Sequence, residues 1–231
     1  MSKILLIIDP QNDFVDPRGS LYVKGAEKVV ENLCKFLDKE GDKYDQIAVT
    51  QDSHHKIHIS FKDGWTNKPE PFSTVVVKVG SDFELCAKDL EIAYYGDTGV
   101  NIWPDHCVIG TWGHCFPENL SEALGRWEIR NRKPVIYQRK GENCGYEAYS
   151  AYTDESFGKD KPGWRRIKHD ELDICGFCKD ICVAETIKDL VTKTDENVCL
   201  LDSYSATLNS DSENLKILKE LEEKGQIKIT V

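Results

Sequence analysis

The sequence predicts an α/β fold in which a mainly parallel central sheet carries helices on both of its faces. Apolar runs typical of buried strands alternate along the chain with amphipathic helical segments, and this spacing is typical of βαβ units. Several of the apolar runs end in a charged residue, as buried parallel strands commonly do at the sheet edge. The length of 231 residues favours a single domain over residues 1–231 rather than two small ones.

Short apolar and β-branched runs predict the strands. In chain order these runs cover residues 3–9 (KILLIID), 46–50 (QIAVT), 73–79 (STVVVKV), 134–138 (PVIYQ), 171–176 (ELDICG), 197–202 (NVCLLD) and 226–231 (QIKITV). Because the carboxyl ends of parallel strands share one edge of a sheet, residues just beyond these ends are expected to meet there.

Helical periodicity fills the intervals between several of these strands. Residues 26–38 place their apolar side chains on one face of a helix, and residues 117–124 are also predicted to be helical. Asp180 is expected to cap a third helix. Ser210 and Glu213 form a capping-box pattern that opens a fourth helix.

Composition excludes several classes of partner. The formal net charge of -10 argues against nucleic acids and anionic membranes, which the acidic surface would repel. The apolar run of residues 4–8 is too short for a signal-peptide core or a membrane span, so a cytoplasmic or nuclear location is expected. Nine cysteines follow no disulfide framework, and most are expected to be reduced, buried thiols.

Several residues with side chains suited to catalysis or metal binding lie just beyond the predicted strand ends. They are Asp9, Asp52, Lys140 and the segment before Cys182. Residues 80–103 and 141–170 are long, polar and poorly periodic, and they are expected to form loops that cover a site. The predicted sheet can therefore bring together groups that are far apart in the sequence.

A candidate metal site consists of Asp52, His54 and His106. Two imidazoles and one carboxylate suit Zn²⁺ or another first-row divalent ion, with coordination positions left for water or substrate. His58 is a further ligand or a partner of a ligand. The alternative is that these histidines lie on the surface of a polar loop.

Cys182 is a candidate nucleophile because it follows a glycine turn and falls in the first turn of a predicted helix. A helix N-terminus lowers the pKa of a thiol and offers free amides to an oxyanion. Two other interpretations stay open. Cys175 and Cys178 form a C-x-x-C pattern that suits redox or zinc chemistry, and Cys182 can be a small residue packed under the helix.

Lys140 and Asp9 are the charged candidates. A lysine at a strand end is usually solvated, but beside a buried carboxylate it stabilises a thiolate. Asp9 can be a base, a metal ligand or a turn cap, and on local pattern alone the cap is favoured.

The order of these motifs resembles the nicotinamidases of the isochorismatase-like cysteine hydrolase superfamily. The resemblance runs from Ile4 to about Leu190, and the C-terminal helix and strand fit the same fold. It rests on residues 9–14 (DPQNDF), 52–54 (DSH), 103–107 (WPDHC), 140–141 (KG) with 149–151 (YSA), and 176–183 (GFCKDICV). Relatives acting on isochorismate or N-carbamoyl compounds generally lack the D-x-H and W-P-x-H-C pair.

The resemblance implies roles for individual residues. It implies a catalytic triad of Cys182, Asp9 and Lys140, and a cis peptide between Phe177 and Cys178 beside the oxyanion hole. It also implies a metal that contacts the pyridine nitrogen, and ring packing by Phe14, Trp103 and Tyr149. In this family the second residue of the cis peptide is usually a small aliphatic residue, and here it is Cys178, a second thiol close to the nucleophile.

The implied reaction is hydrolysis of nicotinamide to nicotinic acid and ammonia, which feeds NAD salvage. Asp9 takes the Cys182 proton, Lys140 helps to hold the charge, and the amides of Cys178 and Cys182 bind the oxyanion. The cofactor is expected to be one Zn²⁺ ion, with Fe²⁺ or Mn²⁺ as alternatives. The partner is the small-molecule substrate, and a homo-oligomer is compatible with the sequence.

Three alternative functions remain. The first is a metal-bearing amidase for another aromatic or heteroaromatic amide. The second is a catalytically silent binding module of the same fold. The third is a thiol–disulfide protein, which requires an exposed Cys175 of low pKa.

Overall fold

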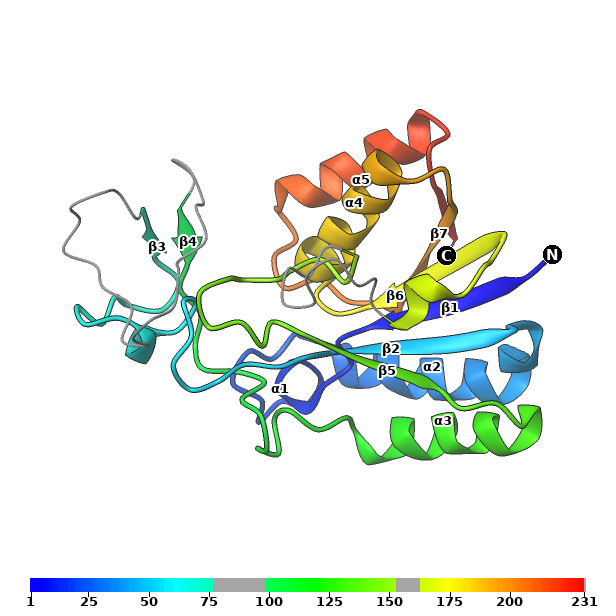
Figure 1. Ribbon diagram of the computed structural model, residues 1–231, viewed down its shortest axis with the longest axis horizontal. Helices are drawn as coiled ribbons and strands as arrows, with labels where there is room; N and C mark the ends of the chain where they lie inside the picture. Colours follow the sequence, from blue (N-terminus) through cyan, green and yellow to red (C-terminus); the bar gives the residue numbers. More distant parts are fainter. Residues whose placement is uncertain (77–98, 153–162, 231) are drawn as a thin grey trace.

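A computed structural model describes residues 1–76, 99–152 and 163–230 of the protein (Figure 1). Within these residues a six-stranded sheet has the order β5-β2-β1-β6-β7-β8, and every pairing in it is parallel. The strands are β1 (Lys3–Ile8), β2 (Gln46–Asp52), β5 (Ile136–Lys140), β6 (Glu171–Gly176), β7 (Asn197–Ser205) and β8 (Lys228–Thr230). The predicted parallel α/β fold is confirmed.

Helices cover both faces of the sheet (Figure 1). They are α2 (Ala26–Glu40) and α3 (Glu118–Asn131) on one face, and α4 (Ala184–Lys193) and α5 (Glu213–Glu223) on the other. The shorter elements are α1 (Asn12–Val15), η1 (Gly41–Lys43), η2 (Lys62–Gly64), η5 (Gly163–Arg166) and η6 (Lys179–Val183), a π-helical turn that leads into α4. None of the described helices has the length and apolar character needed to cross a membrane.

The strand order puts the switch point of the sheet between β1 and β6. The chain leaves β1 for β2 and β5 on one side and returns through β6 to the other side. In sheets of this kind the crevice at the switch point lies beyond the carboxyl ends of the two central strands. The residues that follow β1 and β6 therefore face each other across this crevice.

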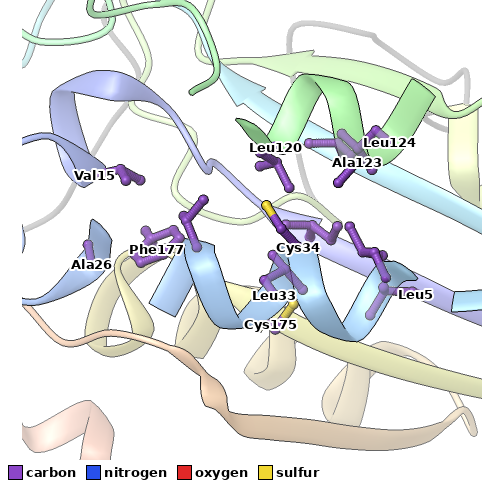
Figure 2. Packing of buried hydrophobic residues seen from close by; sticks show 14 of the residues in the cluster. Leu5, Val15, Ala26, Leu33, Cys34, Leu120, Ala123, Leu124, Cys175 and Phe177 are labelled. Atoms are coloured by element: carbon purple, nitrogen blue, oxygen red, sulfur yellow. The ribbon is translucent and has the colours of Figure 1, made fainter. Parts of the chain in front are cut away.

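Two apolar layers hold the helices against the sheet, because successive side chains of a strand point to opposite faces. Leu5 of β1, Leu33 of α2 and Leu120 of α3 belong to one buried cluster, part of which Figure 2 shows. Ile4 of β1 packs on the other face with Ile187 of α4. β1 is buried on both faces, which explains its uninterrupted apolar sequence.

The run predicted at residues 73–79 does not join the central sheet. Its described part, β3 (Thr74–Val75), pairs antiparallel with β4 (Val100–Asn101) in a separate two-stranded sheet. Residues 77–79 lie outside the described residues, as do Cys86, Val231, and parts of the loops predicted at 80–103 and 141–170. The β-branched composition therefore predicted a strand correctly but did not reveal its pairing partner.

Several helix ends and caps differ from prediction. α3 runs to Asn131 rather than ending at residue 124. Asp180 does not cap a helix, because its carboxylate accepts the amides of Leu208 and Asn209 and ties the start of η6 to the segment after β7. The predicted capping box is also wrong, since Ser212 immediately precedes α5 and its side chain makes no capping hydrogen bond.

Candidate active site

Three residues predicted to be catalytic meet at the carboxyl edge of the sheet. The Lys140 Nζ lies 2.9 Å from Asp9 Oδ2 and 3.6 Å from Cys182 Sγ. The same Nζ donates to Asp52 Oδ1 at 2.9 Å and to the carbonyl of Ala148 at 3.1 Å. Lys140 is fully buried, so its ammonium is held by these groups in place of water.

Local backbone geometry turns Asp9 into the site. Asp9 follows β1 with a φ of 45°, a left-handed conformation that is uncommon for a residue with a side chain. Thr50 of β2 stabilises this turn, because its hydroxyl accepts the Asp9 amide at 3.0 Å and donates to Asp9 Oδ1 at 2.6 Å. The carboxylate is thus held at both its oxygens, by Thr50 and by Lys140.

Burial and neighbouring charges shift the pKa values of Asp9 and Asp52 in opposite directions. Burial raises the pKa of Asp9, the Lys140 ammonium opposes this, and the Asp52 carboxylate adds to it. The pKa of Asp52 is held well below its ordinary value because His54 and Lys140 outweigh the effect of burial. The pKa of Lys140 is well above its ordinary value, since Asp52 and Asp9 overcome desolvation. Asp9 is therefore the group suited to exchanging a proton.

Cys182 lies in η6, directly after the turn that follows β6. Gly176 allows that turn, because it has a φ of 129° and an added Cβ would lie 2.1 Å from the carbonyl oxygen of Ile8. The peptide between Phe177 and Cys178 is cis, as the resemblance implied. The Cys178 carbonyl then accepts the amides of Ile181 and Val183, the residues on either side of Cys182.

The surroundings of Cys182 raise the pKa of its thiol, whereas its place in the first turn of a helix was expected to lower that pKa. Burial raises the pKa of the Cys182 thiol well above its ordinary value, although Lys140 acts to lower it. The Asp9 carboxylate contributes further to this rise. A helix N-terminus alone does not ionise a thiol that is almost fully buried beside carboxylates.

The C-x-x-C interpretation lacks support in the structure. Cys175 is fully buried in the layer beneath α2, and burial raises the pKa of its thiol far above the ordinary value. The pKa of Cys178 is also raised by burial. A thiol–disulfide protein needs an exposed thiol of low pKa at the first of these positions.

Asp52, His54 and His106 form a buried group with ligand atoms within 4.8 Å of one another. Each imidazole places its Nδ1 against a backbone carbonyl, at 3.1 Å from Gly141 for His54 and 2.8 Å from Pro104 for His106. This leaves the Nε2 atoms facing Asp52 Oδ2, at 3.0 Å and 3.3 Å respectively.

These residues fit a divalent metal ion. Two imidazole Nε2 atoms and a carboxylate oxygen this close together need a proton or a metal ion among them, and carbonyls on Nδ1 select the tautomer that binds a metal through Nε2. The charges of the group also favour binding of a cation. Although burial opposes the charged form of His54, the Asp52 carboxylate raises the pKa of His54 to about 9. The site therefore attracts positive charge.

His58 lies beside this group rather than in it. Its ring is 4.2 Å from that of His54, and its Nδ1 accepts the amide of Ser60 at 3.2 Å. Burial holds the pKa of His58 well below its ordinary value. Phe61 packs edge-on against His54 and His106, with ring centroids at 5.2 Å and 5.4 Å, and local sequence pattern did not identify it.

Sequence analysis missed two residues that position Asp52, His54 and His106 (the metal group), although both lie in the motif of residues 9–14. The Gln11 side chain donates to the Asp52 carbonyl and accepts the Asp52 amide, both at 2.7 Å. Asp13 accepts the amide of Cys107 at 2.7 Å, next to His106. The sequence signal for both residues was the motif of residues 9–14. Its polar side chains are buried because they bond to partners distant in the sequence.

The predicted ring-packing residues lie on two sides of the site. Phe14 contacts His106, with ring centroids 5.5 Å apart. Trp103 donates its indole N–H to the Tyr149 hydroxyl at 3.1 Å. Trp103 and Tyr149 also line a cavity of about 530 Å³, and its lining includes Ile181, the sequence neighbour of the candidate nucleophile.

No protein-family model matches the chain. Among characterised proteins, the nicotinamidase of Saccharomyces cerevisiae is 29% identical, and the alignment covers 94% of each chain. The nicotinamidase of Schizosaccharomyces pombe is 31% identical over 79% of this chain and 73% of the relative. A solved structure of the yeast nicotinamidase superposes with a TM-score of 0.75 at 26% identity, covering 99% of both chains. A second structure of that protein, bound to the inhibitor nicotinaldehyde, gives a TM-score of 0.73 at 28% identity and the same coverage.

Proposed function

The chain belongs to the nicotinamidase family, and we propose that Asp9, Lys140 and Cys182 are the residues with which it hydrolyses nicotinamide to nicotinic acid and ammonia. The observation that supports these roles is the single buried ammonium of Lys140, which contacts both the candidate base and the candidate nucleophile. The reaction is an amide hydrolysis that serves NAD salvage.

The first step forms a thioester. The Cys182 sulfur attacks the carbonyl carbon of the amide while Asp9 takes the thiol proton, so no free thiolate accumulates in the resting enzyme. The negative charge that develops on the carbonyl oxygen is met by the amides of Cys178 and Cys182, each typically worth roughly 2.7–4 kcal/mol. Asp9 then passes its proton to the nitrogen as the C–N bond breaks, and ammonia leaves.

The second step restores the thiol. Water attacks the thioester carbonyl while Asp9 takes one of its protons, and the C–S bond breaks to release nicotinic acid. Asp9 returns the proton to Cys182. Lys140 stays protonated throughout, since both of its carboxylate neighbours hold its pKa well above the ordinary value. Its charge keeps the pKa of Asp9 low enough for proton exchange.

Asp52, His54 and His106 would hold one divalent metal ion, which we propose to be zinc, with iron or manganese as alternatives. When bound, such an ion supplies a Lewis acid that accepts the pyridine nitrogen and orients the ring. Phe14, Trp103 and Tyr149 would pack against that ring. We further propose one domain over residues 1–231, because β1 and β8 belong to the same sheet.

We propose a cytoplasmic or nuclear location. The described cysteines are all free thiols, which suits a reducing compartment.

Ammonia release from nicotinamide by the purified, metal-loaded protein tests the proposed function. The native protein should turn nicotinamide over, and Cys182→Ala should not. Benzamide has the amide but no ring nitrogen, so it should be a poor substrate. A native protein that hydrolyses benzamide as well as nicotinamide would be a general aromatic amidase, and a native protein inactive on both would be a silent member of the fold.

A further inference from the structure

We propose that the cavity of about 530 Å³ beside Trp103 and Tyr149 is an outer subsite that binds the neutral heteroaromatic amide before it reaches Cys182. This inference rests on the proposed function, and it assigns a substrate-binding role to residues outside the catalytic and metal groups. The cavity is lined by three aromatic residues, by the aliphatic Ile181 and Leu208, and by several amide and hydroxyl side chains. That mixture of apolar walls and a few polar groups is typical of small-molecule sites.

The cavity adjoins the proposed reaction site through shared walls. Trp103 and Tyr149 line it, and both are proposed to pack against the substrate ring at the inner position. The Trp103 indole N–H donates to the Tyr149 hydroxyl, so these two side chains form one continuous wall of the cavity. Ile181 forms another part of the lining and is bonded directly to Cys182. A flat ligand in the cavity therefore lies next to η6, the turn that contains Cys182.

Phe72 provides an aromatic wall at the outer side. Its side chain is 70% exposed, yet its ring lies edge-on to Trp103 with centroids 6.1 Å apart and an angle of 89°. The φ of Phe72 is 66°, and its amide donates to the carbonyl of Ile102 at 2.6 Å. A bulky residue in this conformation is strained, and such strain is concentrated at functional positions. Phe72 and Trp103 together present rings to a flat heteroaromatic ligand.

The polar lining distinguishes substrate from product. Asn209 and Ser212 can bond to a carboxamide, which both donates and accepts. Asp180 and Glu185 also line the cavity, where Asp180 accepts two backbone amides and Glu185 is paired with Lys188 at 2.7 Å, while no described residue that lines the cavity is a lysine, arginine or histidine. Nicotinic acid leaves as a carboxylate and would meet two carboxylates but no cationic side chain in this lining, so the cavity favours the neutral amide over the anionic product.

Steady-state kinetics of two variants test the subsite without touching the catalytic group. Phe72→Ala removes an outer wall, and Ser212→Trp fills the cavity. Phe72→Ala should raise KM for nicotinamide by roughly threefold to tenfold, the range of one aromatic contact, while kcat at saturating amide changes little. Ser212→Trp should also raise KM, because its indole occupies the cavity. Ile129→Ala, which removes an exposed side chain on α3, is the matched control and should match the native protein.

Product inhibition provides a second readout. Because the outer subsite rejects the carboxylate, the inhibition constant of nicotinate should stay native in Phe72→Ala while KM for the amide rises. If both variants and Ile129→Ala share the native KM, the cavity is not a substrate subsite, although the proposed function stands. Equal shifts for amide and carboxylate would also overturn the inference. A native protein without turnover would instead overturn the proposed function.

Discussion

Lys140 connects the chemistry of the site, because its ammonium is buried between two carboxylates and the candidate nucleophile. A buried lysine with two acidic partners stays charged, so its role is electrostatic rather than that of a base. In the proposed mechanism Asp9, whose pKa is raised, therefore carries the proton transfers, while Asp52 stays ionised. The environment thus assigns different roles to two chemically identical side chains.

We predict that Cys182→Ala abolishes amide hydrolysis while binding of the pyridine ring persists, because the metal ligands and aromatic walls are unchanged. Cys178→Ala is the matched control, since the role proposed for Cys178 belongs to its backbone amide. It should keep most of the activity. Ammonia release and nicotinamide binding are measured for both variants. A loss in Cys178→Ala as deep as in Cys182→Ala would return the redox interpretation.

Asp9→Asn and Lys140→Ala should each reduce kcat by about a hundredfold or more, the range of general acid–base catalysis. Their double variant should lose little beyond either single one, because groups that act as a unit are not additive. Lys133→Ala, in which an exposed lysine is removed, is the control. Losses that multiply in the double variant would show that the two residues act independently.

The pH profile follows from the direction of the Asp9 shift. A base works only when unprotonated, and burial raises the pKa of Asp9, so activity should fall as the pH drops through that raised value. The acid limb of kcat/KM is therefore expected above the ordinary aspartate pKa of about 3.9. Because the buried groups titrate together, the limb reports the cluster and not one residue. A limb at or below the ordinary value would contradict Asp9 as the base.

Strand ends and the turns after them decide where the functional side chains point. The turn after β5 is an instructive case. Gly141 has a φ of 79°, its carbonyl accepts Nδ1 of His54, and an added Cβ would lie 2.8 Å from His54 Cε1 and 3.1 Å from Asp52 Oδ1. The glycine after Lys140 thus leaves room for the proposed metal ligands Asp52 and His54.

Gly141→Ala should weaken metal binding and lower the melting temperature. The left-handed conformation costs a residue with a side chain roughly 1–2 kcal/mol, and the new methyl also displaces His54. Gly25→Ala is the matched control, because Gly25 has a φ of 84° but open space around its Cβ. It should lose stability and keep native metal affinity. Equal metal affinity in the two variants would show that Gly141 does not shape the site.

The metal group joins two separate parts of the chain, the end of β2 and the loop that holds His106. A ligand that binds only the folded state stabilises it by mass action, by about 2.7 kcal/mol at a concentration a hundredfold above its Kd. Binding of a metal ion should therefore stabilise the arrangement of distant segments as well as the site.

We expect one divalent ion per chain by elemental analysis. Removing the ion with a chelator should lower the melting temperature and weaken nicotinamide binding. His54→Ala and His106→Ala should show the same loss without a chelator. His55→Ala, which changes an exposed neighbour, is the control and should retain the ion. A native protein with no bound metal and unchanged ligand binding after chelation would remove the proposed role of the ion.

The strands, the main helices and the chemical candidates could be predicted from sequence because their signals are local. β1 is buried on both faces and reads as an unbroken apolar run, and helix α2 shows its buried face in its spacing. The ordered motifs placed Asp52, His54 and His106 in one group, and the structure brings them together. The sequence alone thus determined the fold class and the kind of chemistry.

Only the tertiary structure decided how these parts interact. The pairing of Thr74 with Asn101, the bonds from Asp180 to Leu208, and the contacts of Lys140 all join residues far apart in the chain. Local sequence patterns do not reveal which distant residues will become partners. The protonation state of Cys182 depends on burial and on surrounding carboxylates, which exist only once the sheet has brought them together. Long-range packing therefore set the electrostatics that local sequence could not.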